Sequence, residues 1–284
     1  MSLDAPQTPP QPRGRSDVPF LLALGLLGGL YVLLIVGMLV ADASYTTPGH
    51  LWDALKSREI RYAIKLSLIS CTITAILSVW VAVPLGYLLS RYRFRGKALL
   101  DVLLDIPIVL PPLVIGLCLL ILFQVPIGSH TLDEFLREWL HFPVTYAIPS
   151  VIIAQFAVAA AFAVRTMRVT FDQISPRQEQ VALTLGCSRS QAFWQVVLPQ
   201  ARRGVVTAAT VAWARALGEF GPVLIFSGAT RLHTEVLPTS VFLELSIGHL
   251  EGAVAVSALM VVVALVVLLI VRLYGMEAGP TALR

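Results

Sequence analysis

Long apolar runs separated by short polar stretches dominate this sequence. A bilayer core about 30 Å thick is crossed by a helix of about 20 consecutive apolar residues. Six runs are long enough, and they predict transmembrane helices at residues 18–41, 62–90, 107–125, 147–164, 205–227 and 253–271. The pattern therefore predicts an all-α membrane protein, with a transmembrane domain over residues 18–284 after a proline-rich, disordered tail at residues 1–17.

The composition agrees with a chain whose solvent is lipid. Of the 284 residues, 57% are hydrophobic and 13% are charged, whereas soluble domains carry about 25% charged residues. The net charge of +4 would suggest nucleic acid in a soluble protein, but in a membrane protein it marks cytoplasmic loops. We therefore expect a lipid membrane and no nucleic acid as partner. The 3 cysteines are too scattered for a disulfide framework or a metal site.

The distribution of positive charge predicts the orientation. With both termini in the cytoplasm, fourteen of the 21 Lys and Arg residues lie in cytoplasmic segments, six in external segments, and Arg215 inside a span. This excess favours cytoplasmic termini, although a basic cluster at residues 56–65 opposes it. Residues 41–43 resemble a signal-peptide cleavage site, but the apolar run before them is longer than the 7–15 residues typical of a signal peptide.

Two external stretches have the pattern of interfacial helices. Thr131 and Glu134 have capping-box spacing, and the apolar residues that follow up to Leu140 recur on one helical face. Residues 51–55 show a weaker version of the same pattern. Both stretches are interpreted as packing elements.

The stretch between the fourth and fifth spans, at about residues 168–202, is long and neither apolar nor of low complexity. Residues 178–185 suit a helix, and Gly186 suits the left-handed position that ends one. Ser188 can cap a second helix, which Pro199 is expected to end. We predict a helix, a glycine turn and a second helix in the cytoplasm.

This loop resembles that of the ABC importer permeases of bacteria and archaea, whose pattern is E-A-A, three residues, Gly, nine residues, I-x-L-P. Four residues match at the right spacing, namely Ala182, Gly186, Leu198 and Pro199. Val196 replaces Ile, Gln180 and Val181 replace the first Glu and Ala, and Glu179 is displaced by one position. The resemblance implies that a coupling helix in this loop docks onto a separate ATP-binding subunit. The implied coupling residues are Glu179, Gln180, Ala182, Gly186, Arg189, Val196, Leu198 and Pro199.

The resemblance covers residues 61–272, and residues 90–97, 100–112, 213–221 and 234–238 are similar to permeases for molybdate, tungstate and sulfate. It implies a subunit of a bacterial or archaeal plasma-membrane importer, with molybdate or tungstate favoured over sulfate. The implied partners are two ATP-binding subunits, a second permease copy in a homodimer, and an external solute-binding protein. The alternatives are an ABC permease for iron, phosphate or a polyamine, and a secondary transporter. The chain has no phosphate-binding GxxxxGK[ST] motif, so we expect no enzymatic activity, catalytic residue, metal or cofactor of its own, with ATP bound by the partner subunit.

Charged residues and prolines inside the spans are the candidates for a translocation path. Arg215 and Glu219 are four residues apart, so on a helix they share a face and can pair. Because a charge in the membrane faces a bundle interior or water, the pair either meets the substrate or holds the fifth helix in place. Pro111 and Pro112 delete backbone donors within the third span and are the other path candidates, with ordinary kinking as the alternative.

Three further features are interpreted without a binding role. Asp101 and Asp105 follow a basic cluster at a helix start, so charge pairing and the helix dipole explain them, with a metal or proton-relay role as the lesser alternative. The basic cluster at residues 91–97 is expected to set orientation and contact lipid headgroups, with ATPase docking as the lesser alternative. The 5 histidines show no metal-ligand spacing and are assigned no chemistry.

Overall fold

The computed structural model describes residues 18–276 except 46, 128–129 and 141–142, so the tail predicted at residues 1–17 lies outside it. The regular secondary structure of the described part is helical apart from one short hairpin. In chain order the helices are α1 (Val18–Tyr45), α2 (Pro48–Lys56), α3 (Arg58–Arg91), α4 (Lys97–Val109), α5 (Pro112–Phe123), α6 (Leu132–Leu140), α7 (Ile148–Gln173), α8 (Pro176–Thr184), α9 (Arg189–Ala192), α10 (Leu198–Leu217), α11 (Gly221–Ser227), α12 (Leu237–Ser246) and α13 (Leu250–Met276), with a π-helical turn η1 (Phe193–Val197) before α10. The strands are β1 (Pro126–Ile127) and β2 (His130–Thr131).

The chain divides into two units, residues 1–45 and residues 46–284. The first contains α1, which matches the predicted first span and continues four residues beyond it. An 18-residue stretch within it has a mean hydropathy of 2.5, and its length suits a membrane crossing.

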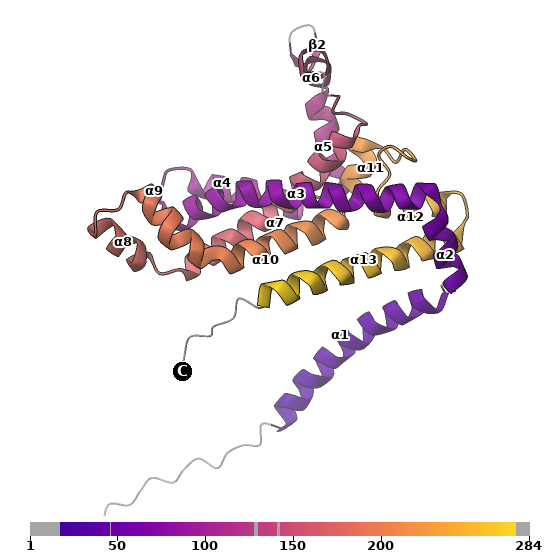
Figure 1. The fold of residues 1–284 in the computed structure, drawn as a ribbon, viewed down its shortest axis with the longest axis horizontal. Helices are drawn as coiled ribbons and strands as arrows, with labels where there is room; N and C mark the ends of the chain where they lie inside the picture. The colour runs from indigo at the N-terminus through magenta and orange to yellow at the C-terminus, as the bar shows by residue number, and fades with distance from the viewer. Residues whose placement is uncertain (1–17, 46, 128–129, 141–142, 277–284) are drawn as a thin grey trace, which may run out of the picture. The chain divides into compact units, whose positions relative to one another are not determined.

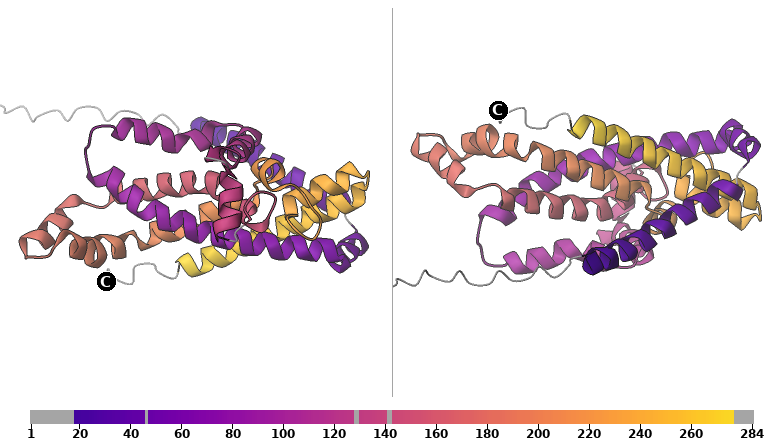
Figure 2. Two further views of the ribbon diagram at one scale, coloured as in Figure 1. Left: turned by 90° about the horizontal axis from the view of Figure 1, so that it is seen from above. Right: turned by 90° about the horizontal axis from the view of Figure 1, so that it is seen from below.

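The second unit is built around three long helices, α3, α7 and α10, which pack side by side (Figures 1 and 2). Small residues allow the close approach. A Cβ at Gly86 of α3 would lie 2.8 Å from the Met167 Cβ of α7, and a Cβ at Gly204 of α10 would overlap the Thr170 side chain. Without a hydrophobic driving force between helices in lipid, such close backbone packing supplies much of the association.

The bundle has two distinct ends (Figures 1 and 2). Helices α8 and α9 lie at one of them, which we call the loop end, and α2 lies with the α12–α13 turn at the opposite, or far, end. Helices α3 and α13 enclose the predicted second and sixth spans, and α7 covers all of the predicted fourth span except its first residue. Among the described residues, four helices (α1, α3, α7 and α13) are long and apolar enough to cross a membrane, and the bent pair α4–α5 would make a fifth span.

The two remaining predicted spans are interrupted. At the third, α4 and α5 meet at an angle of 114°, because Pro111 and Pro112 cannot continue the hydrogen-bond ladder of α4. At the fifth, α10 ends at Leu217 and α11 begins only at Gly221. The prediction of one continuous helix at residues 107–125 and at residues 205–227 is therefore wrong.

The predicted interfacial helices are present as α2 and α6. The capping box before α6 is confirmed, because the Thr131 amide donates to Glu134 Oε2 at 2.8 Å and the Glu134 amide donates to Thr131 Oγ1 at 3.2 Å. A β1–β2 hairpin, in which Pro126 lies opposite Thr131, precedes α6. The sequence pattern does not predict these two short strands.

Candidate functional site

The loop between α7 and α10 is the first part of the candidate site. Because α7 continues to Gln173, the loop begins six residues later than predicted. Gly186 has φ of +92°, its amide donates to the Leu183 carbonyl at 3.1 Å, and the Cys187 amide donates to the Ala182 carbonyl at 3.1 Å. These two bonds form a Schellman motif, which confirms the predicted glycine turn.

The second helix of the loop starts as predicted but does not stop as predicted. Ser188 and Gln191 form a reciprocal capping box, with bonds of 2.8 and 3.2 Å. The helix then runs through η1 directly into α10, so the expectation that Pro199 ends it is wrong. In the π-helical turn the Leu198 amide donates to the Phe193 carbonyl, five residues back. This wider turn, followed by Pro199 near the start of α10, avoids the clash that a proline causes inside a regular helix.

The implied coupling residues range from buried to exposed. Ala182 is buried, Glu179, Val196 and Leu198 are half-buried, and Gln180, Gly186, Arg189 and Pro199 are exposed. The exposed surface of the loop also carries large apolar side chains: Leu185 is 80% exposed, Trp194 63% and Val181 56%. Exposed apolar clusters of this kind mark interaction surfaces.

Glu179 joins the loop to α3. Its Oε1 accepts a hydrogen bond of 2.5 Å from the Tyr87 hydroxyl, and its Oε2 lies 3.3 Å from the Arg91 Nε. Arg91 also donates to the Ile174 carbonyl at 2.8 Å, and the Tyr87 ring packs edge-on against Phe193 at 4.7 Å. The sequence predicts an orientation signal at Arg91 and does not predict this anchor, for which the displaced Glu179 is the available hint.

The second part of the site is the break between α10 and α11. Arg215 Nη2 lies 2.6 Å from Glu219 Oε1, which confirms the predicted pair. Glu219 lies beyond the end of α10, however, and not on its face. Its side chain is 2% exposed, whereas that of Arg215 is 40% exposed, with the guanidinium carbon 5.0 Å from the centre of the Phe162 ring. Glu219 is therefore enclosed by protein, and Arg215 keeps one open side.

The two interrupted spans pack against each other at their breaks. A Cβ at Gly221 would lie 2.9 Å from the Pro112 Cβ, and a Cβ at Gly116 would lie 2.8 Å from the Pro222 Cα. Irregular backbone at membrane depth must be enclosed by protein or line a water-filled cavity. The structure thus brings the predicted path residue Pro112, next to Pro111, close to the segment that carries Glu219.

One exposed face of α10 connects the two parts of the site. It carries small or polar residues at helical spacing, which we call the α10 polar face: Arg203, Thr207, Thr210, Ala214 and Gly218. Thr210 is half-buried and the other four are exposed. A face that met lipid would carry large apolar side chains instead.

The acidic residues of α4 have basic partners on α7, whereas the sequence suggested the basic cluster that precedes α4. Asp101 pairs with Arg168 at 2.6 Å, and Asp105 lies 4.0 Å from Arg165. These pairs hold α4 against α7.

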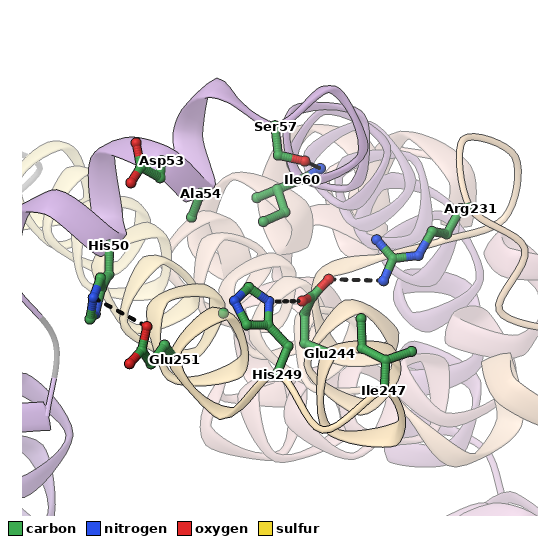
Figure 3. Close-up of a pocket in the computed structure, with 11 residues that line it drawn as sticks. His50, Asp53, Ala54, Ser57, Ile60, Arg231, Glu244, Ile247, His249 and Glu251 are labelled. Carbon is green, nitrogen blue, oxygen red and sulfur yellow. Dashed lines mark hydrogen bonds and ion pairs between the residues drawn. The ribbon is translucent and has the colours of Figure 1, made fainter.

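The far end contains an ionic cluster that the sequence pattern does not predict (Figure 3). Glu244 accepts from Arg231 at 2.9 Å, its other oxygen lies 2.7 Å from His249 Nδ1, and its side chain is 8% exposed. His50 pairs with Glu251 at 3.3 Å beside the same cavity of about 570 Å³. These contacts tie the loop before α12 and the α12–α13 turn to Glu244 of α12, and helix α2 to the start of α13. No group of three metal-binding side chains occurs among the described residues.

Comparison with known proteins identifies the family. Residues 82–276 match the family model described as "Binding-protein-dependent transport system inner membrane component". The chain is 31% identical over 255 residues to the sulfate transport system permease protein CysT of Escherichia coli, an alignment covering 88% of this chain and 90% of CysT. It is also 31% identical over 254 residues to the molybdenum transport system permease protein ModB of Mycobacterium tuberculosis, with 89% and 94% covered.

A solved structure has the same fold. It is a bacterial alginate ABC transporter in complex with an alginate pentasaccharide-bound periplasmic protein, and one chain of it superposes with a TM-score of 0.71 at 18% identity, covering 94% of this chain and 98% of that chain. The helical loop, the broken spans and the family match agree with one another. The chain belongs to the binding-protein-dependent inner-membrane components and is a permease subunit of an ABC importer.

Proposed function

We propose that this permease carries a tetrahedral oxyanion, with molybdate or tungstate favoured and sulfate the alternative. Relatives with both kinds of substrate cover most of the chain at similar identity. All of these substrates are small dianions that need hydrogen-bond donors and positive potential along their path. Arg215 supplies positive charge at the break in the fifth span.

The α10 polar face is the observation that carries the proposal. Arg203 and Thr207 lie exposed on a helix at the core of the bundle, and charged residues in a membrane-spanning segment face the bundle interior or water. A water-filled path shared with a second permease subunit would place this face in water. We infer a homodimer, in which the two α10 polar faces line one path.

The exposed surface of the loop is the proposed docking site for the ATP-binding subunit. Leu185 and Trp194 provide apolar area, and Arg189 and Gln180 provide polar contacts at its edge. This division into an apolar centre and a polar rim is typical of protein interfaces. Two such loops in a dimer would receive two ATP-binding subunits, which bind the ATP, and the external solute-binding protein would dock at the far end.

Coupling follows from the continuity of the chain through Pro199. Helix α9, η1 and α10 form one uninterrupted run from the docking surface to Arg215. Glu179 clamps the start of the loop to Tyr87 and Arg91 of α3. A movement of the ATPase would therefore shift α3 and α10 together and change the packing at the Arg215–Glu219 break, since packed helices are bistable and not continuously deformable.

The orientation follows from the same proposal. The loop end faces the cytoplasm, where ATP is available, so both termini are cytoplasmic in a six-span arrangement in which the broken segments count as the third and fifth spans. The expected location is the inner membrane of a bacterium or archaeon, and the far end faces outward.

The deciding experiment is uptake of labelled molybdate and sulfate into proteoliposomes that contain the permease, its ATPase and its binding protein. We expect ATP-dependent uptake of at least one oxyanion, and loss of ATPase co-purification in Leu185→Glu. The matched control is Gln178→Glu, which adds the same charge at an exposed polar position of α8. Uptake of neither oxyanion, or uptake without the ATPase, would contradict the proposal.

A further inference from the structure

One face of α3 carries unpaired positive charge at the far end of the bundle. Arg61 and Lys65 are four residues apart, so they share a face of the helix, and both side chains are exposed. Neither side chain forms an ion pair or a hydrogen bond with another described residue. Arg58 lies on the same face but next to the acidic Glu59, so its charge is partly balanced.

This end of α3 lies at the level expected for lipid headgroups. In α2, which directly precedes α3, Trp52 is 61% exposed, and Lys56 Nζ lies 5.3 Å from the centre of its ring. An exposed Trp is typical of the interface between membrane and water. Beyond Lys65 the exposed face of α3 becomes apolar, with Ile76 64% exposed. The two unpaired basic side chains therefore lie where they can reach lipid phosphates.

An apolar groove of about 420 Å³ continues along the same face of α3. Thr72, Ile76 and Val79 form its α3 side, and residues of α10 and α13, which lie alongside α3 (Figure 1), complete it. From Lys65 to Val79 the helix rises about 20 Å. This length is enough to hold an acyl chain across one leaflet, whose hydrocarbon layer is about 15 Å thick.

The polar atoms of the groove are already satisfied within the protein. The Thr72 hydroxyl donates to the Leu68 carbonyl at 2.7 Å, and the Thr210 hydroxyl donates to the Val206 carbonyl at 2.8 Å. The Trp213 indole N–H donates to Thr72 Oγ1 at 3.4 Å. The described lining residues carry no charged group. The groove therefore suits a hydrocarbon chain, whereas a polar solute would lose its hydrogen bonds there.

We propose that this face of α3 binds an anionic phospholipid, with the phosphate at Arg61 and Lys65 and an acyl chain in the groove. The unpaired charges select an anionic headgroup, and the groove holds the lipid at one place, unlike the diffuse attraction of a basic patch to a membrane surface. The site also gives a role to the basic cluster at residues 56–65, which opposes the positive-inside rule. The assignment to the outer leaflet, and nothing else in the proposal, rests on the proposed function above.

Native mass spectrometry of the permease–ATPase complex tests the headgroup contact. The complex in maltoside detergent is titrated with palmitoyl-oleoyl phosphatidylglycerol, and phosphatidylcholine with the same acyl chains is the comparison lipid. We expect phosphatidylglycerol to bind more tightly. Arg61→Gln and Lys65→Gln should each weaken its binding about fivefold, the effect of one basic residue near an anionic lipid surface, and should leave the binding of phosphatidylcholine unchanged.

The groove is tested separately. Ile76→Trp fills part of the groove from an exposed position, where a larger side chain is tolerated. It should weaken the binding of both lipids, because the lost contact is with the acyl chain. Two matched controls should leave both affinities unchanged. Arg137→Gln removes an exposed basic residue of α6, and Ile121→Trp enlarges a 57% exposed side chain of α5.

Four results would overturn the lipid site. Two are equal binding of the two lipids by the parent, and unchanged affinity for phosphatidylglycerol in the double variant Arg61→Gln with Lys65→Gln. A disulfide between copies at Ile76→Cys, in a background with Cys118→Ser and Cys187→Ser, would assign the groove to a second copy of the chain. Loss of docking of the solute-binding protein in the same double variant, with lipid affinity unchanged, would assign the charges to that protein.

The failure of the lipid site is distinguishable from that of the proposed function. A complex that imports an oxyanion into proteoliposomes but shows no preference for phosphatidylglycerol refutes the lipid site alone. A complex that binds phosphatidylglycerol as described but imports no oxyanion refutes the proposed function, and the site then stands without an assigned leaflet.

Discussion

Replacing Gly186 tests the turn on which the coupling loop depends. Its φ of +92° lies in the region that L-residues with a Cβ avoid, and no heavy atom lies within 4 Å of the position that a Cβ would take. The cost of a substitution is therefore conformational and not steric. We estimate about 1–2 kcal/mol for alanine, offset by about 0.4–1 kcal/mol because alanine also restricts the unfolded loop.

A net strain of about 1 kcal/mol changes an equilibrium about fivefold. If the strained turn opens in the free permease and must re-form on docking, Gly186→Ala should bind the ATPase about fivefold more weakly. Gly186→Val should bind more weakly still, because a β-branched residue is a stronger outlier at positive φ, and Gly186→Asn should stay close to the parent. The assay is titration of the purified ATPase against the permease in detergent.

Gly248 provides the matched control. It has φ of +77°, has no heavy atom near its Cβ position, and lies at the far end between α12 and α13. Gly248→Ala should therefore lower thermal stability by a similar amount without weakening ATPase binding. Equal affinity across the alanine, valine and asparagine variants of Gly186 would refute the reasoning.

Three further outcomes are expected. Glu179→Gln should reduce the coupling of ATP hydrolysis to uptake, because the anchor to α3 loses one charged hydrogen bond of about 1.5–3 kcal/mol. The Kd for the ATPase should stay within about threefold of the parent's. Unchanged coupling in a hydrolysis-and-uptake assay would contradict the anchor. Arg215→Gln should destabilise the permease by about 3–5 kcal/mol, because Glu219 is left buried without a partner. The double variant Arg215→Gln with Glu219→Gln should recover thermal stability but not transport. Recovery of both would show that the Arg215–Glu219 pair has only a structural role. Gly252→Ala should lower the melting temperature, because the new Cβ would lie 2.5 Å from His249 Nδ1 and break the contact between His249 and Glu244 at the far end. An unchanged melting temperature would contradict this.

The features that the sequence predicted are those with local signals. Gly186 and Ser188 lie within a few residues of the groups they bond, so spacing alone predicted the turn and the capping box. The apolar runs behind α1, α3, α7 and α13 are long enough to determine a helix by themselves. The Arg215–Glu219 pair was found for the same reason, since its members are four residues apart.

The features that were missed depend on tertiary context. Tyr87 and Glu179 are 92 residues apart, and nothing in the sequence links them. The breaks at Pro111 and before Gly221 occur inside apolar runs, so hydropathy does not reveal them, and they become visible only where α5 and α11 pack together. Pro199 was misjudged because a proline normally ends a helix, whereas here a π-helical turn accommodates it.

The central claim is that ATP-driven movement of the loop changes which side of the membrane the α10 polar face is open to. Accessibility of Ala214→Cys, in a background that lacks Cys118 and Cys187, tests this most directly. In proteoliposomes with the ATPase and binding protein, we expect a membrane-impermeant thiol reagent to label this cysteine from the loop side without nucleotide and from the far side with trapped ATP. Leu185→Glu should abolish the switch. Labelling from the same side in both nucleotide states would contradict the account.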